Sequence, residues 1–250
     1  MKRIFAFVAI MVLFAAGVSF AYEVVDVKNG GSIKGKIKAA EHIADPVIKI
    51  VIKPKPDPKE TELERSTCGD SQKANMYVLS AANEVKNVLV IVEDVQKGKA
   101  APKTDLVIDN TKCYFDPIVG IAYKGANFKI KNSDPLLHNT NLGLLLTETT
   151  RRSVYNLALP NKDQVITKPV RATGLIIVKC DAHDWMRGYV YASDNPYVAI
   201  TDANGNFEIK DLPAGKYKVR IFHEGFKEVT RSVEVSSGKA SELDATLAKK

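Results

Sequence analysis

The sequence has few of the residues that most often bind metals or catalyse reactions, with 4 His, 3 Cys and a single Trp among 250 residues. A site rich in imidazoles therefore cannot be built from this chain. No basic stripe with interleaved aromatic residues is present, which argues against nucleic-acid binding. After the first residues, no apolar run is long enough to span a membrane. No later segment sustains a 3.6-residue period over the length of a helix, so the globular chain is predicted to be all-β.

The N-terminal segment has the pattern of an export signal. Lys2 and Arg3 form a short basic start, an apolar run covers 4–18, and Ser19 and Ala21 are the small residues that precede a cleavage site. We expect residues 1–21 to be removed, which gives a periplasmic or secreted protein with no transmembrane span. An uncleaved membrane anchor is the alternative, because the apolar segment is at the lower length limit of a span.

The charge balance is mildly basic. The chain has 36 Lys and Arg against 29 Asp and Glu, a net charge of +7, and the signal holds two of the basic residues. The remaining chain therefore carries a net charge of +5. This excess is spread along the sequence, as expected of a solvated surface, and it would steer an acidic protein partner toward the molecule.

One short segment concentrates three soft or borderline metal ligands. Cys180, His183 and Met186 are separated by two residues each. The β-branched run 175–178 before them and the segment 189–191 after them favour strands. The three side chains therefore lie on a short loop held at both ends, which can direct them to one point.

His138 occupies a similar place earlier in the sequence. It follows the alternating segment 128–131, which predicts a strand, and the turn residues 132–135. Two imidazoles and a thiolate in one plane, with a weak axial thioether, form the ligand set of blue-copper centres. The other two histidines, His42 and His223, are too few for a second copper centre of three histidines.

Residues 104–192 resemble the cupredoxin family of type 1 (blue) copper proteins, of the amicyanin/plastocyanin-like type. The resemblance implies a Greek-key β-sandwich and one copper ion, with His138, Cys180 and His183 as equatorial ligands and Met186 as the axial ligand. It also implies that Asn139 ties the two ligand loops together. The chain departs from the family at Asp181, where a small neutral residue is usual. The residues that carry the resemblance are Asn132, Asp134, His138, Asn139, Cys180, His183, Met186 and Gly188.

The cysteine count agrees with this assignment. An exported protein with 3 Cys has one thiol left over after pairing. If Cys180 is a metal ligand, Cys68 and Cys113 remain to form a disulfide. Such a bridge would stabilise the fold by roughly 3–4 kcal/mol in the chain-entropy model.

The ligand set predicts a carrier of single electrons rather than an enzyme. A fully occupied ligand shell leaves no open position for water or substrate, which argues against hydrolysis. The expected partner is a redox protein such as a cytochrome c or a dehydrogenase, docking on an apolar face made by Trp185, Met186 and 142–146. Two alternatives stay open, namely a copper chaperone or storage protein and a metal-free β-sandwich that binds carbohydrate or protein.

The rest of the chain up to residue 192 is expected to belong to the same unit as the metal site. Short strands are predicted in 22–52, at 75–79 and at 85–92, and the Lys- and Pro-rich segment 53–66 is predicted to be a solvated loop or linker. The segment 147–156 is compatible with a short helix or an irregular loop. The predicted domain is therefore 22–192, a cupredoxin-like copper domain with an N-terminal β extension.

A second, smaller domain is predicted from a turn cluster at residues 193–196 to the C-terminus. Asn204-Gly205 between two apolar segments predicts a hairpin, because Gly accepts the positive φ of such turns. The segment TDANGNFEIKDLPAGKYKV resembles the carboxypeptidase regulatory-like, transthyretin-type β-sandwich. The resemblance implies that 193–250 is a packing or interaction module without catalysis. His223 is predicted to be structural and His42 to be a surface residue.

Overall fold

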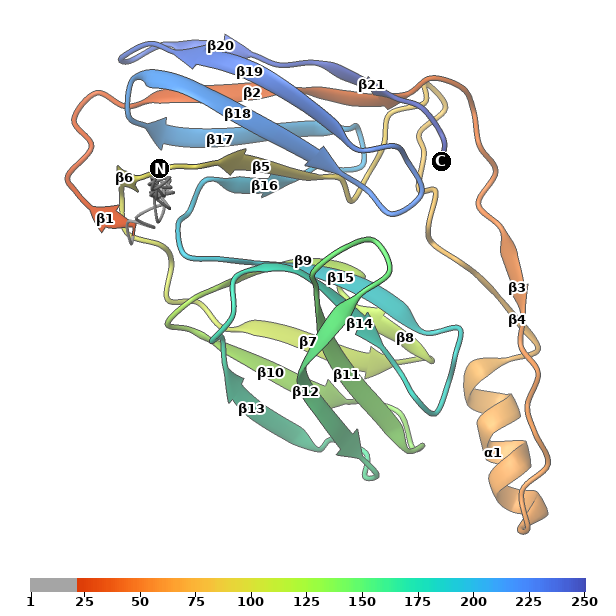
Figure 1. Cartoon of the computed structure of the whole chain (residues 1–250). Helices are drawn as coiled ribbons and strands as arrows, with labels where there is room; N and C mark the ends of the chain where they lie inside the picture. The colour runs from red at the N-terminus through yellow and green to blue at the C-terminus, as the bar shows by residue number, and fades with distance from the viewer. Residues whose placement is uncertain (1–21) are drawn as a thin grey trace, which may run out of the picture.

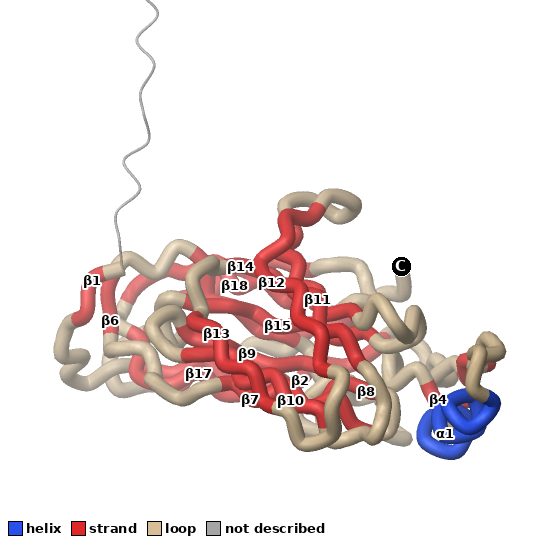
Figure 2. Tube along the Cα trace, turned by 90° about the horizontal axis from the view of Figure 1, so that it is seen from below, coloured by secondary structure: helices blue, strands red, loops and turns tan. Residues whose placement is uncertain are grey.

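The computed structural model describes residues 22–250, so the predicted export signal lies outside the described part of the chain. Twenty-one strands and one helix make up the regular structure of this part (Figure 1), in agreement with the all-β prediction. The helix is too short and too polar to span a membrane. The strands form two β-sandwiches, with a short arm of residues 47–73 beside one of them (Figure 2).

The central sandwich spans residues 106–193 and packs a four-stranded sheet on a five-stranded sheet. The sheet orders are β13-β10-β7-β8 and β12-β11-β14-β15-β9, and the pairs β7–β10 and β9–β15 are parallel. In β10, Phe128 and Ile130 face the core while Lys129 and Lys131, which alternate with them, face outward, as the alternation of a half-buried strand requires. The strands are β7 (Leu106–Thr111), β8 (Tyr114–Asp116), β9 (Val119–Tyr123), β10 (Asn127–Asn132), β11 (His138–Leu145), β12 (Arg151–Leu159), β13 (Val165–Pro169), β14 (Gly174–Lys179) and β15 (Arg187–Ser193).

The terminal sandwich is built from both ends of the described chain. One sheet has the order β16-β5-β18-β19, and the other has the order β17-β2-β20 with β21 also paired to β2. Ile33 and Ile37 of β2 and Val90 and Val92 of β5 are buried in its core. The strands are β2 (Gly31–Ala39), β5 (Leu89–Glu93), β16 (Val198–Ile200), β17 (Asn206–Leu212), β18 (Gly215–Phe222), β19 (Val229–Val235), β20 (Ala240–Glu242) and β21 (Ala245–Leu247). A parallel pair of short strands, β1 (Glu23–Val24) and β6 (Lys97–Gly98), lies nearby (Figure 1).

These pairings differ from the expected division of the chain at residue 193. β2 and β5 were expected to belong with the metal domain, but they lie in the two sheets of the terminal sandwich. The physical reason is the size of the C-terminal segment. A domain of about 60 residues buries a smaller fraction of its surface than a larger one and is only marginally stable, and β2 and β5 enlarge the shared core.

The expected hairpin at Asn204-Gly205 is wrong. β16 pairs with β5 and β17 pairs with β2, so this turn joins the two sheets of the sandwich instead of two neighbouring strands. Gly205 has φ +70°, and its carbonyl oxygen accepts a hydrogen bond from the backbone N–H of Ile37 at 2.9 Å. The prediction of a turn with positive φ at Gly205 is therefore confirmed, whereas β16 and β17 pair with β5 and β2 instead of with each other.

The two sandwiches meet through an apolar layer. Leu89 and Ile91 of β5 and the neighbouring Val198 pack against Leu175 and Ile177 of β14, together with Tyr189 of β15. All of these side chains are nearly or fully buried. The central strands that lead into the loop of Cys180, His183 and Met186 are therefore packed on both faces.

The arm contradicts the prediction of a solvated linker at 53–66. It contains β3 (Val47–Lys49), α1 (Pro58–Cys68) and β4 (Ser71–Lys73), with β3 and β4 paired. Asp57 caps the helix by accepting a hydrogen bond from the N–H of Lys59, and Pro58 stands at the first helical position. The undecided segment 147–156 forms a turn and the start of β12.

Several contacts hold the arm against the central sandwich. Cys68, at the end of α1, forms a disulfide with Cys113 between β7 and β8, as the sequence predicted. Gln72 donates to the carbonyl oxygen of Lys112 at 3.0 Å, and the Tyr114 hydroxyl donates to that of Lys73 at 2.9 Å. Ile50 packs into the core of the central sandwich. The arm is thus a fixed part of this end of the molecule.

Candidate metal centre

His138 is positioned by the loop that leads into β11. The side chain of Asn132 donates to the carbonyl oxygen of Leu136 at 2.8 Å, and its oxygen accepts the N–H of Asp134 at 3.0 Å. These bonds fold the loop tightly, because the Asn side chain replaces backbone partners that the turn leaves free. His138, at the first position of β11, is fully buried.

The second loop joins the antiparallel strands β14 and β15. The last ladder pair is Lys179 with Arg187, and the loop between them is closed by a hydrogen bond from the N–H of Cys180 to the carbonyl oxygen of Met186, at 3.3 Å. The N–H of Met186 also donates to the carbonyl oxygen of His183 at 3.0 Å. Cys180, His183 and Met186 are all buried, although they lie in a loop.

The structure brings His138, Cys180 and His183 together. The two Nδ1 atoms of the histidines are 3.0 Å apart. The sulfur of Cys180 lies 3.9 Å from Nδ1 of His138 and 3.6 Å from Nδ1 of His183. Metal–nitrogen bonds of about 2.0–2.1 Å and metal–sulfur bonds of about 2.3 Å, at angles of about 95–130°, place ligand atoms roughly 3.0–3.9 Å apart. The three atoms therefore fit around one metal ion.

Asp134 orients His138 by a hydrogen bond on the Nε2 side of the imidazole. Nε2 of His138 is 2.8 Å from a carboxylate oxygen of Asp134 and donates to it, which leaves Nδ1 free to face Cys180 and His183. The same carboxylate accepts the N–H groups of Lys112 and Cys113. Burial alone would raise the pKa of Asp134, but these hydrogen bonds outweigh it and lower the pKa.

Glu64 of α1 faces His183 from the arm. Its Oε1 lies 3.5 Å from Nε2 of His183, and its Oε2 pairs with the ammonium of Lys55 at 2.6 Å. The ring of Trp185 also packs against the imidazole of His183, with 5.1 Å between the ring centres. Glu64 was not among the predicted site residues, because its segment was expected to be a solvated loop or linker and no local pattern pairs residue 64 with residue 183.

The thiol of Cys180 is placed to ionise. Burial would raise its pKa, but interactions with both histidines and the backbone N–H of Asn139, 3.4 Å from the sulfur, lower the pKa to about 6. A thiolate is the form that binds metals. Asn139 joins the two loops through its backbone, while its side-chain oxygen is buried without a hydrogen-bond partner among the described residues.

The remaining candidates lie as follows. Met186 is 2% exposed and belongs to the same buried cluster as Cys180, so its side chain is enclosed at this end of the core. Asp181 points to the surface and accepts hydrogen bonds from the amides of Asn141 and Asn156. The other two histidines lie in the terminal sandwich or its loops, where the side chain of His42 meets Asn83.

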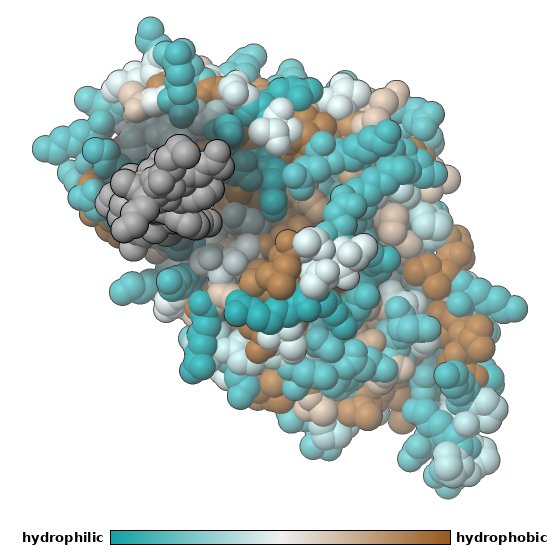
Figure 3. All heavy atoms as spheres, in the orientation of Figure 1, coloured by the Kyte–Doolittle hydropathy of each residue, from teal (hydrophilic) through white to brown (hydrophobic). Residues whose placement is uncertain are grey.

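The expected docking face is wrong in its main residues. Leu142 and Leu144 are buried together with Met186, because alternate side chains of β11 point into the core. Leu146 is exposed beyond the end of β11. Apolar atoms instead gather over the paired strands β3 and β4 of the arm (Figure 3), where Val47 is 67% exposed.

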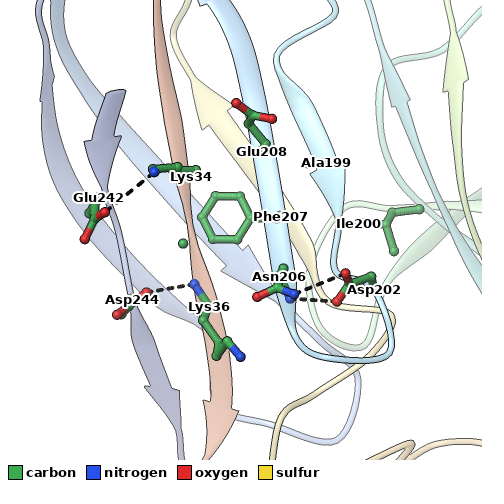
Figure 4. Close-up of a pocket in the computed structure, with 11 residues that line it drawn as sticks. Lys34, Lys36, Ala199, Ile200, Asp202, Asn206, Phe207, Glu208, Glu242 and Asp244 are labelled. Carbon is green, nitrogen blue, oxygen red and sulfur yellow. Dashed lines mark hydrogen bonds and ion pairs between the residues drawn. The ribbon is translucent and has the colours of Figure 1, made fainter. Parts of the chain in front are cut away.

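A surface groove of about 700 Å³ lies on the terminal sandwich (Figure 4). Its charged groups already have partners within the protein. Lys34 pairs with Glu242, Asp244 accepts the backbone N–H of Lys36, and the carboxylate of Asp202 accepts hydrogen bonds from Asn206. Because these contacts satisfy the charges, we assign no ligand to the groove.

Comparison with known proteins gives one family match, at the C-terminal end of the chain. Residues 189–248 match the carboxypeptidase regulatory-like domain family. Comparison with curated protein sequences yields no match. Among solved structures, a copper-containing nitrite reductase from Thermus scotoductus SA-01 is similar over 38% of this chain, at 14% identity and a TM-score of 0.30. This chain covers 23% of the length of that reductase.

Two smaller proteins are similar over nearly their whole length. A purple cupredoxin from Nitrosopumilus maritimus is similar over 36% of this chain and 99% of its own, at 18% identity and a TM-score of 0.31. A reduced Cu(I) form of an amicyanin variant is similar over 41% of this chain and 97% of its own, at 16% identity and a TM-score of 0.29. The case for a metal rests on the ligand geometry described above.

Proposed function

We propose that this chain is an exported type 1 copper protein that carries single electrons between redox partners. The observation that carries the proposal is the convergence of His138 Nδ1, Cys180 Sγ and His183 Nδ1 within 4.8 Å of one another, all three residues buried. Two imidazoles and one thiolate select copper over harder ions. Copper held by such ligands can accept and release one electron.

The chain's own residues would hold the ion and limit what reaches it. Asp134 orients His138, and the closed loop of β14 and β15 fixes Cys180 and His183. Met186 is proposed as the axial ligand, since it ends this loop and is buried beside the same cluster. Because all four side chains are enclosed, electrons can reach the metal while bulky substrates cannot, which favours a carrier over an enzyme.

Export and the partner belong to the same proposal. The disulfide between Cys68 and Cys113 is typical of proteins outside the cytoplasm, which supports a periplasmic or secreted location. The partner is proposed to be a redox protein such as a cytochrome c or a dehydrogenase. The net charge of +5 after removal of the predicted signal favours an acidic docking surface on that partner.

A spectrum of the purified protein with added Cu(II) tests the proposal. We expect an intense visible band from thiolate-to-copper charge transfer and a narrow copper hyperfine splitting in EPR. Cys180→Ser should abolish the band, because it removes the sulfur of the chromophore. His42→Gln, which changes an exposed histidine, should leave it intact.

Other outcomes would replace the proposal with one of its alternatives. A protein that binds Cu(I) without colour and exchanges it quickly would be a chaperone or storage protein. A protein whose spectrum does not respond to copper would be a metal-free binding module. An unchanged band in Cys180→Ser would show that the ligand assignment is wrong.

A further inference from the structure

We propose that Glu64 is a positioning residue for His183, and that the arm which carries it forms part of the metal centre. This inference rests on the proposed function and extends it to residues outside the cupredoxin-like region. In this structure, α1 covers the Nε2 side of His183, which is 3% exposed. The charge and orientation of a metal ligand are then controlled by a segment inserted between β2 and β5.

Burial distinguishes Glu64 from the other acidic residues of α1. Glu60 and Glu62 are exposed, whereas Glu64 is 7% exposed. Its Oε2 pairs with Lys55, whose side chain is 37% exposed, and its Oε1 faces His183. Burying a carboxylate is costly unless a second group offsets the loss of water. The imidazole of His183 is the group that the buried oxygen faces.

The contact between Glu64 and His183 acts mainly through charge. At 3.5 Å it is within ion-pair distance but longer than an ideal hydrogen bond between N–H and oxygen. A carboxylate at this place favours the proton on Nε2, which leaves Nδ1 free to face His138 and Cys180. Negative charge next to a ligand also stabilises Cu(II) relative to Cu(I), which lowers the reduction potential.

The disulfide links Glu64 to the carboxylate behind the other histidine. Glu64 lies four residues, or about one helical turn, before Cys68. The partner cysteine, Cys113, donates its backbone N–H to Asp134 at 2.9 Å. The two carboxylates that face the outer nitrogens of the ligand histidines are therefore tied to the same bridge, and the arm is fixed relative to both ligands.

The test compares Glu64→Gln with Glu62→Gln, an exposed neighbour on the same helix. In redox titrations of the copper-loaded full chain, Glu64→Gln should raise the affinity for Cu(I) relative to Cu(II) about tenfold, equivalent to 59 mV for one electron. Glu62→Gln should match the wild type. Lys55→Gln should shift the ratio the opposite way, because it removes a positive charge, whereas a general loss of structure would not reverse sign.

A second measurement needs no copper. Nitrogen NMR of the metal-free protein reports which ring nitrogen of His183 carries the proton. We expect the proton on Nε2 in the wild type and in Glu62→Gln, and a mixture of both forms in Glu64→Gln. If the wild type shows no copper band, the proposed function fails, while this measurement still decides the role of Glu64.

The disulfide provides an independent variant. Cys68→Ser with Cys113→Ser should reproduce the direction of the Glu64→Gln change, because it frees the arm. The inference is overturned if Glu64→Gln equals Glu62→Gln in both the redox titration and the tautomer measurement. The comparison of Glu64→Gln with Glu62→Gln decides the inference even if the double cysteine variant does not fold.

Discussion

At the scale of single residues, the site depends on how buried polar groups satisfy one another. His138 has a raised pKa, because its interactions with Asp134 and the sulfur of Cys180 outweigh the opposing effect of burial. The thiol of Cys180 has a pKa lowered to about 6 by the same set of contacts. A metal ion that binds here would displace the protons that the Cys180 thiol and the His138 imidazole otherwise hold.

This coupling predicts how the proposed copper binding depends on pH. The metal needs the Cys180 thiolate and neutral histidines, so protons compete with it. Affinity should fall as the pH falls, because the raised pKa of His138 lets it keep a proton more readily than a free histidine, and should fall more steeply below about pH 6, as Cys180 is protonated. Competition with a chelator over about pH 5–8 measures this, and an affinity that stays constant over the range would contradict it.

Met186 offers a second test at this scale. Met186→Leu should keep the visible band, since the chromophore lies between copper and Cys180, and should raise the reduction potential, because it removes a weak donor that favours Cu(II). Redox titration measures the shift. Met76→Leu is the matched control and should have the wild-type potential, since Met76 lies outside the ligand loops. A potential unchanged in Met186→Leu would exclude Met186 as a ligand.

At the scale of elements, the turns between strands position several buried polar side chains. The turn between β18 and β19 places His223 between Tyr77 and Phe226, with ring centres 6.4 and 5.0 Å away. Its Nδ1 accepts the N–H of Gly225 at 3.1 Å. Burial lowers the pKa of His223 to about 4, so the imidazole is neutral in the folded protein.

This histidine makes the stability of the terminal sandwich depend on pH. The folded pKa lies below the unfolded value of 6.5, so the stabilisation is fully present above pH 6.5 and is lost as the pH falls toward 4. The loss amounts to about 3 kcal/mol. Urea unfolding measures the free energy of unfolding near pH 7 and near about pH 4.5. The difference between these two free energies should be smaller for His223→Gln than for the wild type. His42→Gln, as control, should keep the wild-type difference; an equal loss in His223→Gln would refute the assignment.

At the scale of the whole molecule, the two ends of the chain form one sandwich. β2 and β5 come before the central sandwich in sequence, and β16–β21 come after it, yet they share one core. Val90 and Val92 from β5 pack with Val219 and Ile221 from β18. The central sandwich is therefore an insertion between two halves of its neighbour.

This arrangement predicts that residues 193–250 do not fold alone. The fragment lacks β2 and β5, which supply core side chains and the pairing partners of β16, β17 and β18. We expect poor dispersion of its NMR spectrum and no cooperative thermal transition. Adding a peptide of residues 22–98 should restore both. A cooperative transition of the fragment by itself would contradict the prediction.

Local patterns in the sequence predicted a large part of the site. The spacing of Cys180, His183 and Met186 between two strands, together with His138 after a turn, predicted a ligand set. The structure brings His138, Cys180 and His183 close together, while their role as ligands and the position of the Met186 sulfur stay predictions. Parity of the cysteines predicted the pair Cys68–Cys113. The helix α1 carries a cap at Asp57 and Pro58 that local rules recognise, although the composition of the segment favoured a linker.

Residue chemistry and spacing by themselves determined the all-β class, the proposed set of soft ligands and the disulfide, because these depend on neighbours a few residues apart or on counting. Only the tertiary structure decided that Glu64 faces His183, that most of the expected docking face is buried, and that β2 and β5 complete the C-terminal sandwich. Those contacts join residues far apart in the chain, and their energy comes from burial and pairing that no local pattern encodes.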